Sequence, residues 1–290
     1  MKVRVPASSA NLGPGFDSFG LAWQIHNEIS FEPADKLTIS GCDERYAGED
    51  NLCYLAYCRA LQSCGCTPGA LRIEFEKTEI PVSRGLGSSA ALITAGVLAA
   101  NELNGLGLVK EDLLDIATAV EGHPDNIAPA LYGGLTVSLM DGSHAVTRSF
   151  PVSDKLYFTL LIPPFELSTA LSRSVMPHEV GMRDAVFNLS RSALLTRALA
   201  DGDAALLRFA LDDRLHQPYR VSLIEGWEEA KTLAQRLGAI GLCISGAGST
   251  LLCVAEERGF NERMSEAMAA ALPGWRVVDA RPDGKGAQVL

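Results

Sequence analysis

At the centre of the sequence stands Ile80-Pro81-Val82-Ser83-Arg84-Gly85-Leu86-Gly87-Ser88-Ser89-Ala90-Ala91, followed by an apolar run to Ala100. Residues 71–75 just before it alternate between apolar and polar side chains, as in a half-buried strand. Gly85 and Gly87 allow a turn with positive φ and a close approach to a ligand. A helix is then expected from about Ser88 to Leu103, with a stop at Asn104-Gly105. The stretch therefore predicts a strand, a tight turn and a helix in succession.

The start of that helix has the properties of an anion site. The first N–H groups of a helix have no partner inside it, and the helix dipole is positive at this end. The hydroxyls of Ser88 and Ser89 could donate to phosphate or help to hold Mg²⁺. The stretch is not a Walker A loop, because no Gly-Lys-Ser/Thr follows the glycines, and it lacks the glycine spacing of a dinucleotide site. Two interpretations remain: a phosphate-binding loop, or an ordinary glycine turn with a serine cap.

Length and composition set the broad class of protein. The 290 residues suit one large domain or two of ordinary size. Hydrophobic residues make up 47% and charged residues 21%, as in globular proteins. The net charge is −10 and no Lys/Arg-rich run occurs, so a nucleic-acid partner is not expected.

The cysteines and the N-terminus indicate a cytoplasmic protein. Seven Cys are present, an odd number, and none has the spacing of a metal or redox pair. Reduced thiols are the favoured interpretation. The first residues contain no signal-peptide core, and no apolar stretch is long enough to span a bilayer, so no membrane association is expected.

Strands and helices are expected along the rest of the first half. Residues 2–5 alternate like a strand that Pro6 ends, and residues 27–32 and 36–40 resemble strands of an antiparallel sheet. Asn51 is a plausible N-cap for a helix to about Cys64. A further helix is expected over residues 110–121, and a strand over 135–139 with a hairpin turn at Asp141-Gly142.

A glycine-rich loop near the N-terminus, residues 7–20, contains two informative side chains, Asn11 and Asp17. Asn and Asp beside glycines usually form turns through their own side chains. The functional alternative is that they hold a polar substrate, with Asp17 accepting an ammonium or hydroxyl group and Asn11 both donating and accepting. Asp17 lies between Phe16 and Phe19, and a carboxylate buried among aromatic rings needs a partner. This favours the functional interpretation.

A second polar stretch runs from Glu121 to Asn126 and leads into an apolar segment and Gly133-Gly134. Glu121, at the end of a helix, could supply a hard oxygen ligand to Mg²⁺. His123 is not expected to bind metal, since no second His lies nearby. Asn126 either caps the next helix or orients a substrate hydroxyl and the γ-phosphate.

The second half, residues 151–290, is expected to form a separate α+β domain after an N-terminal domain of residues 1–150. Thr169 and Arg173 fall on one face of a helix capped by Ser168, where they could serve a carboxylate. Arg214, His216 and Arg220 concentrate positive charge in an acidic chain, and Arg suits bidentate binding of carboxylate or phosphate. The glycine-rich turn at residues 246–250, between two buried strands, is either a plain hairpin or part of a site.

Three motifs together resemble those of the GHMP kinases, a family of small-molecule kinases. They are Pro6-Ala7-Ser8-Ser9-Ala10-Asn11-Leu12-Gly13-Pro14-Gly15-Phe16-Asp17, Gly85-Leu86-Gly87-Ser88-Ser89-Ala90 and Ser245-Gly246-Ala247-Gly248-Ser249-Thr250. The third motif often has Pro where this chain has Ser249. Residues 123–129 and 213–220 bring the chain nearest to the members that phosphorylate the hydroxyl of L-homoserine in threonine biosynthesis. The resemblance implies an N-terminal domain like ribosomal protein S5 domain 2 and a C-terminal domain with a ferredoxin-like core.

The resemblance also implies roles for individual residues. ATP would contact Asn51, at the adenine, and the central loop: Pro81, Arg84, Gly85, Leu86, Gly87, Ser88, Ser89 and Ala90. Mg²⁺ would be held by Glu121 with Ser88 or Ser89. The substrate would contact Asn11, Asp17, Thr169, Arg173 and Arg220, with its carboxylate on the two Arg. Catalysis would involve Asn126, His123 and Asp17.

The residue at position 126 indicates how the reaction would proceed. Some relatives carry an Asp that acts as a base in this region, whereas Asn126 cannot accept a proton at neutral pH. Catalysis would then rest mainly on alignment of the reacting groups and neutralisation of the γ-phosphate charge, as phosphoryl transfer permits. Asp17 could still take the hydroxyl proton late in the reaction.

Two alternatives of different kinds remain open. One is another kinase of the family, acting on threonine or an isoprenoid alcohol, although an Arg pair for a carboxylate argues against the isoprenoids. The other is a catalytically silent nucleotide-binding module, against which Ser88, Ser89 and Glu121 argue. The sequence leaves the oligomeric state open, with a homodimer among the options.

Overall fold

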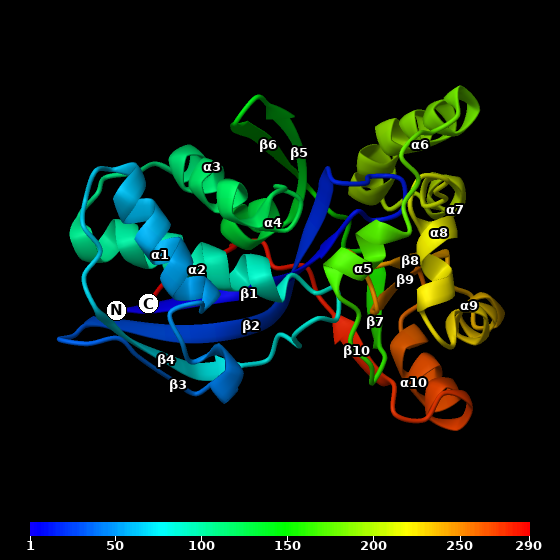
Figure 1. Cartoon of the computed structure of the whole chain (residues 1–290). Helices are drawn as coiled ribbons and strands as arrows, with labels where there is room; N and C mark the ends of the chain where they lie inside the picture. Colours follow the sequence, from blue (N-terminus) through cyan, green and yellow to red (C-terminus); the bar gives the residue numbers. More distant parts are fainter.

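A computed structural model describes residues 1–290 and contains two sheets (Figure 1). The first has the strand order β11-β1-β2-β4-β3, with the β5–β6 hairpin joined to the N-terminal part of β2. Its strands are β1 (Lys2–Ala10), β2 (Phe19–Pro33), β3 (Thr38–Ser40), β4 (Leu71–Thr78), β5 (Leu135–Asp141), β6 (His144–Phe150) and β11 (Gln288–Val289).

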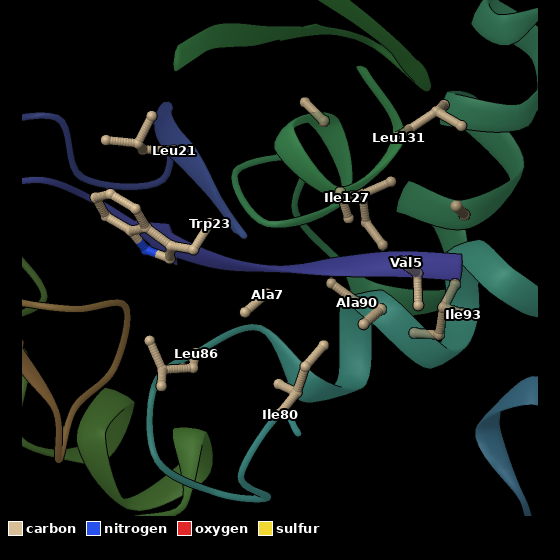
Figure 2. Close-up of a cluster of buried hydrophobic side chains, with 14 of the residues drawn as sticks. Val5, Ala7, Leu21, Trp23, Ile80, Leu86, Ala90, Ile93, Ile127 and Leu131 are labelled. Carbon is tan, nitrogen blue, oxygen red and sulfur yellow. The ribbon is translucent and has the colours of Figure 1, made fainter. Parts of the chain in front are cut away.

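Four helices pack together against this first sheet. They are α1 (Leu52–Ser63), α2 (Ser88–Asn104), α3 (Lys110–Glu121) and α4 (Ile127–Tyr132), and Figure 1 shows them as one layer beside β1 and β2. In β4, Leu71, Ile73 and Phe75 are buried and the residues between them are exposed, as the alternating pattern predicts. The cluster in Figure 2 shows how α2 and α4 meet β1: Ala90 and Ile93 lie near Val5 below the strand in this view, and Ile127 lies above it.

The second sheet is antiparallel throughout, in the order β10-β7-β9-β8. Its strands are β7 (Tyr157–Ile162), β8 (Gly241–Ile244), β9 (Leu251–Ala255) and β10 (Arg276–Ala280). The helices of this half are α5 (Thr169–Ser174), α6 (Met182–Asp201), α7 (Ala204–Ala210), α8 (Gln217–Arg220), α9 (Trp227–Arg236) and α10 (Phe260–Ala271), and short 3₁₀ turns lie at Glu44–Tyr46 and Val221–Leu223.

Strand periodicity divides the hydrophobic residues of the second sheet between two clusters. Leu160 belongs to the main core, with residues of α6 and α7, whereas the next residue, Leu161, packs with residues of α9 and α10. Because successive side chains point to opposite faces, one short strand contributes to both clusters. Both halves are therefore α+β, as predicted, and the main core continues from the first sheet into the second.

The N-terminal loop is shorter than predicted. Strand β1 does not stop at Pro6 but continues to Ala10, and β2 begins at Phe19, eight residues before the predicted strand. A register shift between Pro6 and Ala7 in the β1–β2 pairing accommodates the proline, which has no N–H to donate. The turn proper is thus confined to residues 11–18.

One expectation about the sheets was wrong. Strand β3 pairs with β4 in parallel, whereas an antiparallel arrangement was expected. The C-terminal residues contact the first half, because β11 pairs with β1 and Pro282 forms a bridge with Trp23. A division of the chain near residue 150 stays a prediction, and the last ten residues belong with the first sheet.

Candidate active site

One cavity of about 730 Å³ brings residues of both halves together. Fifteen of the predicted site residues line it: Asn11, Asp17, Asn51, Pro81, Arg84, Gly85, Gly87, Ser88, Ser89, Glu121, His123, Asn126, Thr169, Arg173 and Arg220. Leu86 and Ala90 do not, because their side chains are buried in the main core (Figure 2). The groups predicted to hold phosphate and those predicted to hold an amino acid therefore share one cleft.

The central loop presents free backbone donors to this cavity. Helix α2 begins at Ser88, and its N-cap is Gly87, which has φ +66° and provides no side-chain cap. The serine-capped turn considered above is therefore wrong, because neither hydroxyl caps the helix. The amides of the first turn and the Ser88 hydroxyl are left for a ligand, at the positive end of a 17-residue helix.

Glu121 lies beside this loop at the end of α3. Its Oε2 atom accepts a hydrogen bond of 2.6 Å from the Ser89 hydroxyl. Burial raises the pKa of Glu121, while the hydrogen bond from Ser89 and the nearby His123 act in the opposite direction. No group of three or more His, Cys, Asp or Glu side chains surrounds a common point. The donor set is one carboxylate with hydroxyls, which fits a Mg²⁺ ion that is also held by phosphate oxygens and water.

The turn after β1 is built by Asn11 and Asp17, which both have positive φ. Asn11 Oδ1 accepts a hydrogen bond from the Asp17 N–H at 2.9 Å, and Asn11 Nδ2 donates to Gly246 O at 2.8 Å. Asn11 thus forms a local turn and also ties it to the glycine-rich hairpin of the other half. Non-glycine residues with positive φ are uncommon and concentrate at functional sites.

Two guanidinium groups lie near the ring of Phe16. Arg173 donates to Asp17 Oδ1 at 2.8 Å, and the Arg173 and Arg220 guanidinium carbons lie 5.7 and 5.1 Å from the ring centroid. Phe16 was not predicted to contribute, although it precedes Asp17 in the first motif. An aromatic ring attracts a nearby cation, so Phe16 offsets part of the cost of placing these two charges near it.

Arg220 is the most unusual charge in the site. It is 1% exposed, and no carboxylate oxygen lies within 4.0 Å of its nitrogens. Its partners are neutral: the Ser172 and Gly246 carbonyl oxygens, at 3.3 Å each, and His216 Nδ1 at 3.4 Å. Burial, and then repulsion from Arg173, lower its pKa. A buried cation without an anion is costly, so the cavity is suited to receive one.

His123 and Asn126 are both held by neighbours that were not predicted. Asp125 Oδ1 lies 2.7 Å from His123 Nδ1, and Ser8 Oγ lies 2.8 Å from Asn126 Oδ1. Burial disfavours the charged form of His123, but the hydrogen bond and the charge of Asp125 outweigh this effect and raise the pKa. Asn126 occupies the N-cap position of α4, yet its side chain does not cap the helix.

The remaining predicted residues have structural roles within the cavity wall. Asn51 caps α1 by accepting from the Cys53 N–H at 3.0 Å, which confirms its predicted capping role. Arg84 donates to the carbonyl oxygens of Pro163 and Pro164. Thr169 begins α5, with Ser168 as the predicted cap.

The hairpin between β8 and β9 is also part of the site. Ser245 Oγ donates to Gly85 O at 2.6 Å, and Gly246, Ala247 and Gly248 line the cavity. Ser249 Oγ donates to Phe165 O at 3.0 Å. Residues 246–250 therefore form a hairpin turn and also line the cavity, so the two interpretations of this segment are both correct.

Two features outside the cavity concern the cysteines and the lengths of the helices. All seven cysteines are free, and burial raises the pKa of Cys243 to about 12. None of the helices is both long enough and apolar enough to cross a bilayer.

A helix start with free amides, a carboxylate beside it and a cationic pocket across the cleft are features expected of a small-molecule kinase. Family models agree with this class. Residues 51–134 match the GHMP kinases N terminal domain, and residues 190–274 match the GHMP kinases C terminal domain.

Named relatives extend the match to the full length. The chain is 41% identical to a homoserine kinase of Clostridium botulinum (strain Okra) over 292 residues, covering 100% of this chain and 98% of that protein. It is 38% identical to a homoserine kinase of Clostridium acetobutylicum, with 100% of both chains covered. The crystal structure of homoserine kinase from Cytophaga hutchinsonii superposes with a TM-score of 0.89 at 30% identity, covering 100% of this chain and 97% of that one. This chain belongs to the GHMP kinase family.

Proposed function

We propose that this protein transfers the γ-phosphoryl group of ATP to the side-chain hydroxyl of L-homoserine, forming O-phospho-L-homoserine for threonine biosynthesis. Its similarity to homoserine kinases over the full length supports the substrate. The observation that carries the proposal in this chain is Arg220, a buried guanidinium that lines the cavity without an anionic partner. A substrate carboxylate would supply that partner.

The charges around Arg220 suit a zwitterion. Arg173 Nη2 lies 2.8 Å from Asp17 Oδ1. The two side chains remain 40% and 37% exposed, so both can still be reached by a substrate. An incoming amino acid offers a carboxylate to Arg173 and Arg220 and an ammonium group to Asp17. Each protein charge then meets an opposite charge of the substrate, with little change in the net charge of the cleft. Asn11 and Thr169, on the same wall, are proposed to complete this end of the site.

The opposite end of the cavity is proposed to hold Mg²⁺ and ATP. The α2 amides and the Ser88 hydroxyl would donate hydrogen bonds to phosphate oxygens. Gly85 and Gly87 would let the phosphates approach the backbone. Glu121 and Ser89, or Ser88, would hold Mg²⁺, whose chemistry here is neutralisation of phosphate charge. Asn51 would lie near the adenine, where Pro81 and Arg84 also line the wall.

The catalytic residues are proposed to align and polarise rather than to abstract a proton early. Asn126 has no titratable proton site, and a loose transition state needs little base assistance. His123, fixed by Asp125 at one nitrogen, would border the reacting hydroxyl with its other nitrogen. Asp17 would accept the hydroxyl proton late in the reaction.

The first test is a coupled ADP-release assay with the purified protein. L-homoserine, L-threonine, L-serine and an isoprenoid alcohol are offered in turn, each with and without Mg²⁺. We expect turnover that depends on L-homoserine and Mg²⁺. Faster turnover with another alcohol would identify a different kinase of the family, and nucleotide binding without turnover would identify a silent module.

Two further parts of the proposal have tests of their own. A cytoplasmic location agrees with seven unpaired cysteines, and fractionation of producing cells would test it. A homodimer stays a prediction, which sedimentation of the purified protein would test.

A further inference from the structure

We propose that Ser8 is a positioning residue for the phosphoryl-transfer step, because it fixes which end of the Asn126 amide faces the reacting groups. Ser8 itself does not line the cavity and is fully buried. The inference rests on the proposed function, since it concerns how the same site aligns its substrates.

In the structure Ser8 is the donor and Asn126 Oδ1 the acceptor of the hydrogen bond between the two side chains, and this bond holds the amide in one orientation. Ser8 Oγ donates to Asn126 Oδ1 at 2.8 Å, and its only other acceptor is the Asn126 carbonyl oxygen at 3.4 Å. The carbonyl end of the Asn126 amide therefore points at Ser8. The NH₂ end is left for the cavity, which Asn126 lines. Asn126 would then act only as a donor there, toward the substrate hydroxyl oxygen or a γ-phosphate oxygen.

The same serine is tied to the phosphate-binding loop. Its backbone N–H donates to Leu86 O at 3.1 Å, so the end of β1 is bonded directly to the central loop. A Cβ atom placed on Gly87 would lie 2.1 Å from Ser8 Oγ and 3.0 Å from Asn126 Oδ1. The N-cap of α2 thus lies directly against the Ser8–Asn126 pair. This packing couples the direction of the Asn126 amide to the position of the phosphate-binding helix end.

A freely rotating amide would turn its carbonyl oxygen toward the anionic phosphate part of the time. That orientation repels the transferred group and donates nothing to the nucleophile. Loss of Ser8 is therefore expected to act on kcat rather than on the binding of homoserine or ATP. One hydrogen bond of this kind corresponds to about a three- to tenfold change in rate.

The experiment is a double-mutant cycle with Ser8→Ala, Asn126→Ala and the double variant. We expect Ser8→Ala to lower kcat about three- to tenfold while both KM values change less than about twofold. In the Asn126→Ala background, Ser8→Ala is expected to have no further effect on kcat. Ser8→Thr, which keeps the hydroxyl, is expected to restore most of the rate.

Ser9→Ala is the matched control. Ser9 is the adjacent buried serine of the same strand, but its hydroxyl bonds to Trp23 Nε1 and Ser245 Oγ and not to Asn126. Its effect on kcat should combine with that of Asn126→Ala without coupling. Thermal unfolding of every variant separates a loss of fold from a loss of alignment.

The outcomes distinguish this inference from the proposed function. If the wild-type protein shows no homoserine-dependent turnover, the proposed function itself is wrong. An active wild type in which Ser8→Ala and Asn126→Ala act independently would overturn the role of Ser8 alone. Equal coupling of Ser9 and Ser8 to Asn126 would also overturn it, because both would then act through general packing.

Discussion

Arg220 is the buried side chain on which the proposed substrate depends. It lies at the end of α8, and its guanidinium bonds only to carbonyl oxygens and a histidine nitrogen. Burial lowers the pKa of His216, which keeps that ring neutral beside the arginine. The His216 Nε2 atom lies 2.7 Å from Gly13 O, so its Nδ1 is left as the acceptor that faces Arg220. The pocket therefore keeps a positive charge available for an anion.

Replacing Arg220 by Leu tests this role. A charge-assisted contact to a carboxylate contributes about 1.5–3 kcal/mol, so the KM for homoserine should rise about 10- to 100-fold while the KM for ATP stays nearly constant. Arg214→Leu is the matched control, because Arg214 pairs with Asp184 at 3.1 Å outside the cavity and remains 41% exposed. An unchanged homoserine KM in the Arg220 variant would count against the carboxylate assignment.

Single residues also show what the sequence could and could not predict. Motif order placed Ser88, Glu121, Asn126 and Arg220 in one site, and the cavity contains all of them. The hydrogen bond from Ser8 to Asn126 was not predictable, because the two residues lie 118 positions apart and a serine in a strand has no distinctive local pattern. Partners of this kind become visible only when the packing of β1 against α4 is known.

Helix α2 is proposed to bind phosphate at its N-terminal end only, and its two terminal glycines allow a test of this. Gly87 at the N-cap has φ +66° and Gly105 at the C-cap has φ +60°, so both occupy the left-handed region that favours glycine. Their surroundings differ. A Cβ on Gly87 would collide with Ser8, whereas a Cβ on Gly105 would meet nothing within 4 Å.

The pair Gly87→Ala and Gly105→Ala separates backbone strain from the proposed role in phosphate binding. Both variants should lose about 1 kcal/mol of unfolding free energy from the left-handed backbone. Gly87→Ala should lose more than this, because Ser8 or Asn126 must move, and its kcat/KM should fall at least tenfold. Urea unfolding and the ADP-release assay measure the two effects. Equal activities of the two variants would show that the helix start does not position the phosphates.

The two halves of the molecule are joined by more than the chain connection near residue 150. Residues 281–290 leave the second sheet and return to the first half, where the Asp283 N–H donates to Ala22 O in β2 and the Ala287 N–H donates to Ala130 O in α4. This return could not be predicted from the sequence. A two-residue strand, Gln288–Val289, has no periodicity, and its partner β1 lies at the other end of the chain.

Asp283 holds this returning segment in place. Its Oδ2 atom lies 2.8 Å from His26 Nε2, and its Oδ1 accepts from the N–H groups of Lys285 and Gly286 at 2.8 Å each. Burial alone would raise the pKa of Asp283, but these hydrogen bonds outweigh burial and lower the pKa. A carboxyl with a lowered pKa stabilises the folded state above its ordinary pKa of about 4. That contribution is lost as the pH falls through the folded-state value.

Replacing Asp283 by Ala should therefore destabilise the protein in a pH-dependent way. We expect a loss of about 1.5–3 kcal/mol of unfolding free energy at pH 7, and a smaller difference from the wild type as the pH falls below about 4. Asp279→Ala is the control, because Asp279 is an exposed carboxylate 3.7 Å from Arg281 and should change stability by less than about 0.5 kcal/mol. Urea unfolding of the three proteins between pH 3 and pH 7 provides the comparison. A difference between wild type and Asp283→Ala that stayed constant over this range would show that the charge of Asp283 does not hold the C-terminal segment on the first sheet.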